Sequence, residues 1–157
     1  MKKDHNYWMG VAVAEAEKSA KSGGGPFGCV IVKDGEAVAV TSNSVTHDND
    51  PTAHAEVNAI RMACKKLGTF CLEGCTLYTS CEPCPMCLAA CYWAHVDKIY
   101  YSGDRDDAAI AGFDDFHIYE EFKVPMEERA IPIERIAPEQ GAIPFQAWKN
   151  NENKIEY

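Results

Sequence analysis

A histidine and two cysteines in this chain have the residue types and the spacing of ligands for one metal ion. His54 lies in the sequence His54-Ala55-Glu56, and two residues separate Cys84 from Cys87. One imidazole and two thiolates suit a tetrahedral zinc ion, and three protein ligands leave its fourth position for water. The pattern therefore predicts a catalytic zinc site that holds one ion per chain.

Glu56, two residues after His54, is expected to transfer protons rather than to bind the metal. A carboxylate beside a zinc-activated water can take its proton and deliver it elsewhere. Side chains two residues apart diverge around an ideal helix, but near a helix start both can reach an ion placed off its end. We therefore predict that Glu56 is the proton shuttle of the site.

Both ligand segments have the composition of helix starts. Pro85 suits the first turn of a helix, so Cys84 and Cys87 are expected on one face of it. The sequence Asp50-Pro51-Thr52 predicts a cap-and-proline opening for the helix that begins near His54. The positive end of a helix also favours thiolate over thiol. Two helix N-termini facing one ion are thus predicted to form the site.

Cys81 offers an alternative, because Cys81 and Cys84 have the same spacing as Cys84 and Cys87. We favour the second pair, since Cys81 precedes Pro83 and is expected in the loop that leaves a strand. A non-catalytic zinc module, with Cys81 or His47 as fourth ligand, is the other interpretation of the motif. The remaining cysteines are expected to be reduced and to behave as small buried apolar residues. They are Cys29, Cys64, Cys71, Cys75 and Cys91.

Length, composition and charge restrict the class of protein. A chain of 157 residues is expected to form a single domain with its own hydrophobic core. It has no apolar run of membrane-spanning length and no apolar signal-peptide core near Met1, so we expect a cytoplasmic protein with no membrane partner. The net charge is −9, and the longest basic run is Lys65-Lys66. This charge disfavours nucleic acid as a partner.

Hydrophobic periodicity predicts alternating strands and helices. Helices are expected at about 7–22, from 53 to 67, from the cysteine motif to about 95, and at 145–151. Strands are expected at 29–32, 37–40, 76–79 and 96–101, with a hairpin turn at 33–36 and a possible edge strand at 131–136. This order predicts an α/β sandwich with helices on both faces of the sheet and the metal at its strand-to-helix loops.

Several further stretches carry a resemblance to a known family. They are residues 25–28, Asn43, residues 50–56, 81–87, 92–94, 111–115 and 145–148. On these stretches the chain resembles the cytidine deaminase superfamily, and within it the small bacterial guanine deaminases; the His-x-Glu and Pro-Cys-x-x-Cys pairing is typical of zinc-dependent nucleobase deaminases. The resemblance implies a three-layer α/β/α sandwich, with a mixed sheet of about five strands, in one domain spanning 1–157.

The resemblance also implies a reaction and a set of site residues. The reaction is hydrolytic deamination of guanine to xanthine and ammonia, a step of purine salvage or catabolism. Zinc would be held by His54, Cys84 and Cys87, with Glu56 activating its water and Asp115 relaying protons to the departing amine. Aromatic and polar side chains suit a flat base with polar edges. The residues implied to surround the base are Phe27, Asn43, Ala55, Trp93, Asp115 and Tyr157.

The same resemblance implies a homodimer whose C-terminal tail, at about 150–157, closes the active site from the same or the other subunit. Two other substrate classes remain open. One is another free aminated heterocycle, such as cytosine or an aminotriazine. The other is adenosine in tRNA, which would call for a basic surface that the scattered lysines and arginines do not predict.

Overall fold

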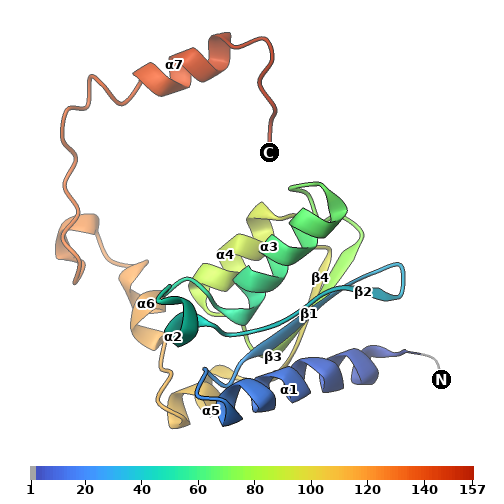
Figure 1. Ribbon diagram of the computed structural model, residues 1–157. Coiled ribbons are helices and arrows are strands. Elements are labelled where there is room, and N and C mark those ends of the chain that lie inside the picture. Colours follow the sequence, from blue (N-terminus) through green and yellow to red (C-terminus); the bar gives the residue numbers. More distant parts are fainter. Residues whose placement is uncertain (1–2) are drawn as a thin grey trace. The chain divides into compact units, whose positions relative to one another are not determined.

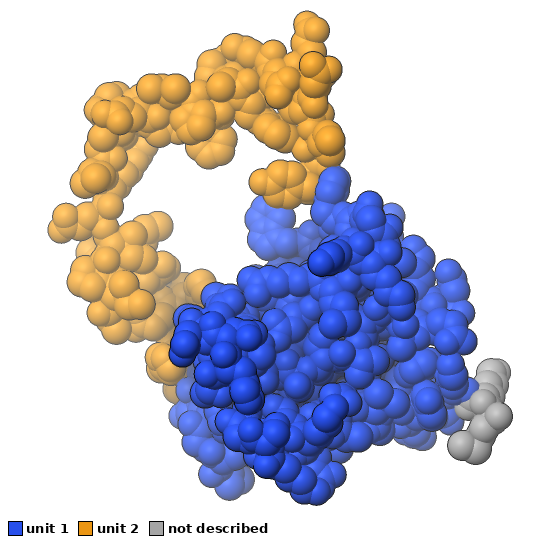
Figure 2. Space-filling view, viewed as in Figure 1, with its two compact units in different colours: residues 1–115 blue, residues 116–157 orange. Residues whose placement is uncertain are grey.

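The computed structural model describes residues 3–157, which divide into two compact units. Figure 2 shows the first unit, up to Asp115, in blue and the second, Phe116–Tyr157, in orange. Met1 and Lys2, the first residues of the segment in which no signal peptide is expected, lie outside the described residues. Between residues 3 and 157, no helix combines the length and the apolar character needed to cross a membrane.

The first unit is built around a mixed sheet of four strands in the order β2-β1-β3-β4. Its strands are β1 (Gly28–Lys33), β2 (Glu36–Ser42), β3 (Cys75–Cys81) and β4 (Lys98–Gly103). β1 pairs antiparallel with β2 and β3, whereas β3 and β4 run parallel and are joined through helix α4 (Pro85–Trp93). The mixed sheet is confirmed, with four strands where about five were expected.

Alternate side chains of β1 point into two separate cores, as the period of a strand requires. Cys29 and Ile31 are buried on the face covered by helix α3 (Ala55–Leu67) and α4. Val30 packs on the opposite face with Trp8 of helix α1 (His5–Lys21). Figure 1 shows α1 on one side of the sheet and α3 with α4 on the other. The predicted three-layer α/β/α sandwich is therefore confirmed.

Gly28 allows α1 to lie close against the first residue of β1. A Cβ atom at this position would be 2.2 Å from the Ala12 carbonyl oxygen and 2.6 Å from the Ala16 amide nitrogen. Both of these are backbone atoms of α1, so a larger residue would force the helix and the strand apart. The close contact fixes the path of the chain next to Phe27, one of the residues expected at the base.

Shorter elements complete the first unit at the edges of the sheet. The hairpin turn between β1 and β2 is formed by Asp34 and Gly35, which both have positive φ angles, as expected for this connection. Helix α2 (Val45–Asp48) lies in the connection between β2 and α3. Helix α5 (Arg105–Ile110) follows β4 and begins with a capping box between Asp104 and Asp107.

The second unit contains helix α6 (Phe116–Glu121), the 3-10 helix η1 (Met126–Glu128) and helix α7 (Ile143–Asn150). Helix α7 confirms the helix expected at 145–151. The possible edge strand at 131–136 is wrong, because these residues are exposed and irregular. Pro132 has no N–H group to donate to a sheet, and the sheet of the described chain contains only β1 to β4.

Candidate functional site

His54, Cys84 and Cys87 converge where α3 and α4 begin. His54 is the N-cap residue of α3, Cys84 is the N-cap residue of α4, and Cys87 follows in the first turn of α4. His54 Nδ1 lies 3.5 Å from the Sγ atom of each cysteine. Among residues 3–157, only these three side chains form a group of potential metal ligands, with their ligand atoms within 4.8 Å of one another. The predicted meeting of two helix starts is confirmed.

The electrostatics of this group favour a thiolate at Cys84. A hydrogen bond from Cys87, together with one from His54, lowers the pKa of Cys84 to about 4. The hydrogen bond shared with Cys84, followed by burial, raises the pKa of Cys87. The hydrogen bond with Cys84 is also the main cause that raises the pKa of His54. The site thus offers an imidazole and a ready thiolate, with a second sulfur beside them, and this donor set fits zinc.

Other thiols near the group hold their protons. Cys81 ends β3 and donates to the Asp104 carbonyl oxygen at 3.6 Å, and burial is the main cause that raises its pKa to about 11. Burial likewise raises the pKa of Cys29, and raises that of Cys91 to about 12. Thiolates rather than thiols bind metal, so these three residues are poor competitors for the ion. Cys81 and His47 both lie outside the ligand group of the described chain.

Glu56 lies beside the ligands, although it follows His54 by only two positions. His54 precedes the helix with extended backbone angles of φ −70° and ψ 155°, so the divergence expected within an ideal helix does not apply. The Glu56 side chain is buried, and its Oε2 atom lies 3.4 Å from Cys87 Sγ. Burial is the main cause that raises the pKa of Glu56. A carboxyl group with a raised pKa is suited to exchange protons near neutral pH.

The loop that carries Asp115 lies next to Phe27. The rings of Phe27 and Phe113 meet edge to face, with 5.0 Å between their centroids and an interplanar angle of 87°. Phe27 thus lies side by side with the loop that carries Asp115. Burial raises the pKa of Asp115, and the negative charge of Cys84 raises it further.

Asn43 and Ala55 are buried in the same unit. The Asn43 N–H group donates to the Phe27 carbonyl oxygen at 3.0 Å, while its side-chain Oδ1 accepts from the Val45 N–H at 3.1 Å. The Ala55 carbonyl oxygen accepts from Thr41 Oγ1 at 2.7 Å. Ala55 opens α3, where the first N–H groups of a helix have no acceptor within the helix. Its amide is therefore suited to a polar atom of a ligand.

Trp93 and Tyr157 have different locations from the other expected residues. Trp93 ends α4 and is 68% exposed, and the rise of a helix puts it about 13 Å along the axis from Cys84. Tyr157 belongs to the second unit, where its ring lies 6.5 Å from that of Trp148 at an interplanar angle of 80°. Trp93 thus belongs to the first unit but stands at the far end of α4, whereas Tyr157 belongs to the second unit.

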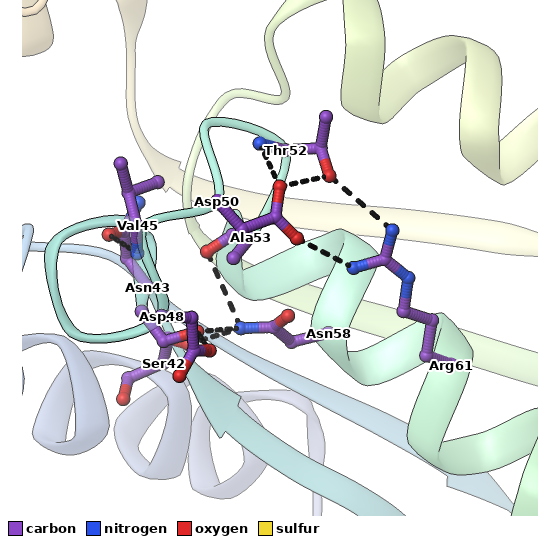
Figure 3. Close-up of polar contacts among 10 residues, drawn as sticks. Ser42, Asn43, Val45, Asp48, Asp50, Thr52, Ala53, Asn58 and Arg61 are labelled. Atoms are coloured by element: carbon purple, nitrogen blue, oxygen red, sulfur yellow. Dashed lines mark hydrogen bonds and ion pairs between the residues drawn. The ribbon is translucent and has the colours of Figure 1, made fainter.

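Asn58, which no motif in the sequence marks, joins the two ends of the loop between Asn43 and His54 (Figure 3). Its Nδ2 atom donates to the Ser42 carbonyl oxygen and to Ser44 Oγ, each at 3.0 Å, with a longer contact of 3.4 Å to the Ala53 carbonyl oxygen. Ser42 and Ala53 immediately precede Asn43 and His54. One amide group therefore fixes the chain beside both residues. An amide one helical turn after the metal histidine is the sequence signal that could have identified it.

Asp50 stabilises the same loop but does not cap α3, so the expected cap-and-proline opening is wrong in detail. Asp50 Oδ1 accepts from the Thr52 N–H at 2.8 Å and from the Thr52 hydroxyl at 2.7 Å. These bonds to Thr52 lower the pKa of Asp50. The Nη1 atom of Arg61, in α3, lies 3.6 Å from Asp50 Oδ2 (Figure 3). The aspartate thus closes a local turn, and α3 begins five residues later with His54 as its cap.

Residues 2–103 match the family profile of the cytidine and deoxycytidylate deaminase zinc-binding region. The matched segment contains the three ligands and Glu56. The chain belongs to this family of zinc-binding deaminases. As in the family, the metal is zinc, one ion per chain, and the residues positioned to hold it are His54, Cys84 and Cys87.

Individual members of this deaminase family are similar to this chain over different lengths. The guanine deaminase of Bacillus subtilis is 54% identical over 155 residues, which cover 98% of this chain and 99% of the relative. The X-ray structure of the B. subtilis enzyme superimposes with a TM-score of 0.96 at 54% identity, over 98% of this chain and 99% of that one. The tRNA-specific adenosine deaminase of Aquifex aeolicus is 45% identical over 96 residues, or 61% of this chain and 64% of the relative.

Proposed function

We propose that this deaminase hydrolyses guanine to xanthine and ammonia. The similarity to the B. subtilis guanine deaminase carries the proposal, because it covers 98% of this chain and so includes residues beyond position 103, where the family profile ends. Similarity to the A. aeolicus tRNA-specific adenosine deaminase covers only 61% of the chain. The second unit is thus part of what the chain shares with a guanine deaminase.

Bound zinc supplies Lewis-acid activation of water as the nucleophile. Glu56 takes a proton from this water at Oε2, the oxygen beside Cys87, and transfers it to the ring nitrogen next to the amine-bearing carbon of the base. Asp115 passes the second proton of the water, released by the hydroxyl group added to the base, to the departing amine. Water and guanine are thereby converted to ammonia and xanthine, and both carboxyl groups return to their starting protonation states.

The proposed base-binding residues divide by chemistry. Phe27, Trp93 and Tyr157 supply aromatic faces for stacking, whereas Asn43, Asp115 and the Ala55 amide address the polar edges of the ring. The hydrogen bond between Asn43 and Phe27, and the ring contact between Phe27 and Phe113, support a common location for Phe27, Asn43 and Asp115.

The proposed assembly is a cytoplasmic homodimer in which residues 1–157 act as one deaminase domain. Its tail, at about 150–157, closes the active site over the base, either in its own subunit or in the other. The exposure of Trp93 and the presence of Tyr157 in the second unit support a contribution from a neighbouring subunit. Closure of this kind excludes water and fixes the orientation of the substrate.

A panel of substrates tests the proposed function. Zinc-loaded protein is incubated with guanine, guanosine, adenine, cytosine, an aminotriazine and a tRNA anticodon stem-loop, and ammonia release is followed. We expect the highest kcat/KM with guanine. The net charge of −9 predicts weak activity on the stem-loop, because nucleic-acid binding relies on basic side chains. Higher activity on the stem-loop than on guanine at moderate salt would overturn the assignment.

A further inference from the structure

Thr79 places a hydroxyl group inside the core, directly beside the carboxyl group of Glu56. Its side chain is 0% exposed and lies on the face of β3 that also carries Leu77, facing α3 and α4. A buried hydroxyl group in such a core requires a hydrogen-bond partner. Thr79 Oγ1 donates to Glu56 Oε1 at 2.9 Å, with the Cys81 carbonyl oxygen a longer alternative acceptor at 3.1 Å.

The backbone at Thr79 is held on both sides. In the sheet, Thr79 pairs with Cys29 of β1 and with Tyr101 of β4, and β3 is an inner strand. Its hydroxyl group is therefore attached to one of the most constrained parts of the unit. Glu56, by contrast, has a long side chain whose terminal torsion is broad unless a partner fixes it.

The two oxygens of Glu56 have different surroundings as a result. Oε1 accepts from the Thr79 hydroxyl, whereas Oε2 faces Cys87, whose Sγ atom lies 3.4 Å away. The thiols of Cys29 and Cys91, which also interact with this carboxyl group, are weak hydrogen-bond donors. Thr79 is thus the strong donor that fixes the rotation of the carboxyl group.

We infer that Thr79 is a positioning residue for the deamination, holding Glu56 through Oε1 so that Oε2 carries out the proton transfer. The inference rests on the proposed function. It assigns the two carboxyl oxygens to separate tasks, one structural and one chemical. It also explains why a threonine occupies a fully buried position where the neighbouring inward residues of β3, Cys75 and Leu77, are apolar.

Substitution of Thr79 by valine tests the inference, because valine keeps the branched shape but removes the donor. Misplacing a catalytic group by about 1 Å can lower the rate about 100-fold, so we expect kcat for guanine to fall about 10- to 100-fold in Thr79→Val. KM, the zinc content and the Kd for xanthine measured by calorimetry should stay near the wild-type values. Thr79→Ser, which restores the hydroxyl group, should recover most of kcat.

Thr76→Val is the matched control, since residue 76 lies on the same strand with its side chain on the opposite face of the sheet. It should leave kcat unchanged. If Thr79→Val does not fold, Thr79→Ala repeats the comparison with a smaller side chain.

Two results would overturn the positioning role while leaving the proposed function intact. The first is an unchanged kcat in Thr79→Val. The second is a loss of activity that parallels a loss of zinc or is not recovered by serine. A wild-type protein that deaminates another base but not guanine would instead contradict the proposed function, and the valine and serine variants would then be compared on that base.

Discussion

His54 and Cys84, 30 residues apart in the chain, cap two different helices, and the His54 Nδ1 and Cys84 Sγ atoms lie 3.5 Å apart. Neither residue makes the side-chain capping hydrogen bond to the helix backbone that is usual at this position. Ser, Thr, Asp or Asn at the N-cap position stabilises a helix by about 1 kcal/mol relative to alanine. Both helices therefore begin with a ligand in place of a capping side chain, and we expect zinc binding to offset the missing stabilisation.

Removal of the metal should therefore destabilise the protein, since an ion that binds only the folded state adds to its stability. We expect a chelator to lower the Tm of wild-type protein. Cys84→Ser should bind no zinc, and in chelator it should be more stable than the wild type by about 1 kcal/mol, because serine is a good N-cap. Metal analysis and thermal unfolding measure both effects.

Cys81→Ala serves as the control for that experiment, because its thiol lies outside the ligand group. It should retain one zinc ion per chain. Loss of zinc in Cys81→Ala together with retention in Cys84→Ser would show that the wrong pair of cysteines was chosen.

Glu56→Gln should retain zinc and lose activity. The amide preserves the size of the side chain and its contact with Thr79 but cannot exchange protons, and general acid-base catalysis contributes about 100- to 10,000-fold to rate. We expect a fall in kcat of that order, measured by ammonia release, with unchanged metal content. A variant protein that lacked zinc would identify Glu56 as a ligand and remove its role as proton shuttle.

Glu56 should also make the metal-free protein less stable as pH rises. Burial raises its pKa in the folded state above the unfolded value of about 4.3. Between these two pKa values the folded state binds more protons than the unfolded state. The stability that protonated Glu56 contributes is therefore fully present below the unfolded pKa and is lost as pH rises through the folded pKa. In chelator, Glu56→Gln should therefore have a higher Tm than the wild type at pH 7. This difference should disappear near pH 4, and an equal difference at both pH values would contradict the burial argument.

Local signals in the sequence were sufficient for the ligands and much of the fold. Pro85 predicts the helix start at the cysteines, and the turn at Asp34 and Gly35 predicts the β1–β2 hairpin. The possible strand at 131–136 failed because a strand needs a partner, and alternation of apolar residues does not supply one. Thr79 and Asn58 were missed for a related reason. Their importance comes from partners 23 residues away in one case and 14 to 16 in the other, which the fold alone brings together.

Asn58→Asp should weaken both the fold and the binding of guanine. The substitution keeps the shape of the side chain, removes its two N–H donors and places negative charge against the carbonyl oxygens of Ser42 and Ala53. Acceptors left without a donor should lower the free energy of unfolding by about 1–3 kcal/mol. Displacement of Asn43 should raise KM for guanine about tenfold, since about 1.4 kcal/mol of binding free energy corresponds to a factor of ten. Urea unfolding and steady-state kinetics measure the two effects.

Arg61→Ala is the control on the same helix, because its side chain is 59% exposed and its ion pair with Asp50 should contribute at most about 1 kcal/mol. If Asn58→Asp changed stability and KM no more than Arg61→Ala does, the amide would have no special role in holding the loop.

The tail is expected to act on the substrate rather than on the fold. Residues 150–157 are polar except for Ile155 and Tyr157, and both of these side chains are exposed. Such a segment has little apolar surface with which to stabilise a core, so Tyr157 needs an explanation other than packing in the core. Closing the base into a water-free pocket is one that fits the proposed chemistry. Deletion of Ile155, Glu156 and Tyr157 should therefore leave zinc content and Tm unchanged and lower kcat/KM for guanine about 10- to 100-fold.

Mixing variants tests whether the tail acts within one subunit or across two. The truncated protein retains Glu56, and full-length Glu56→Ala retains the tail, so a mixed dimer contains one intact copy of each. If the tail closes the active site of the other subunit, the mixture should regain activity that neither variant has alone. Activity that stays low in the mixture would place the tail in its own subunit. A truncated enzyme with wild-type kinetics would exclude Tyr157 from the active site, since the remaining residues would then bind and orient the base without it.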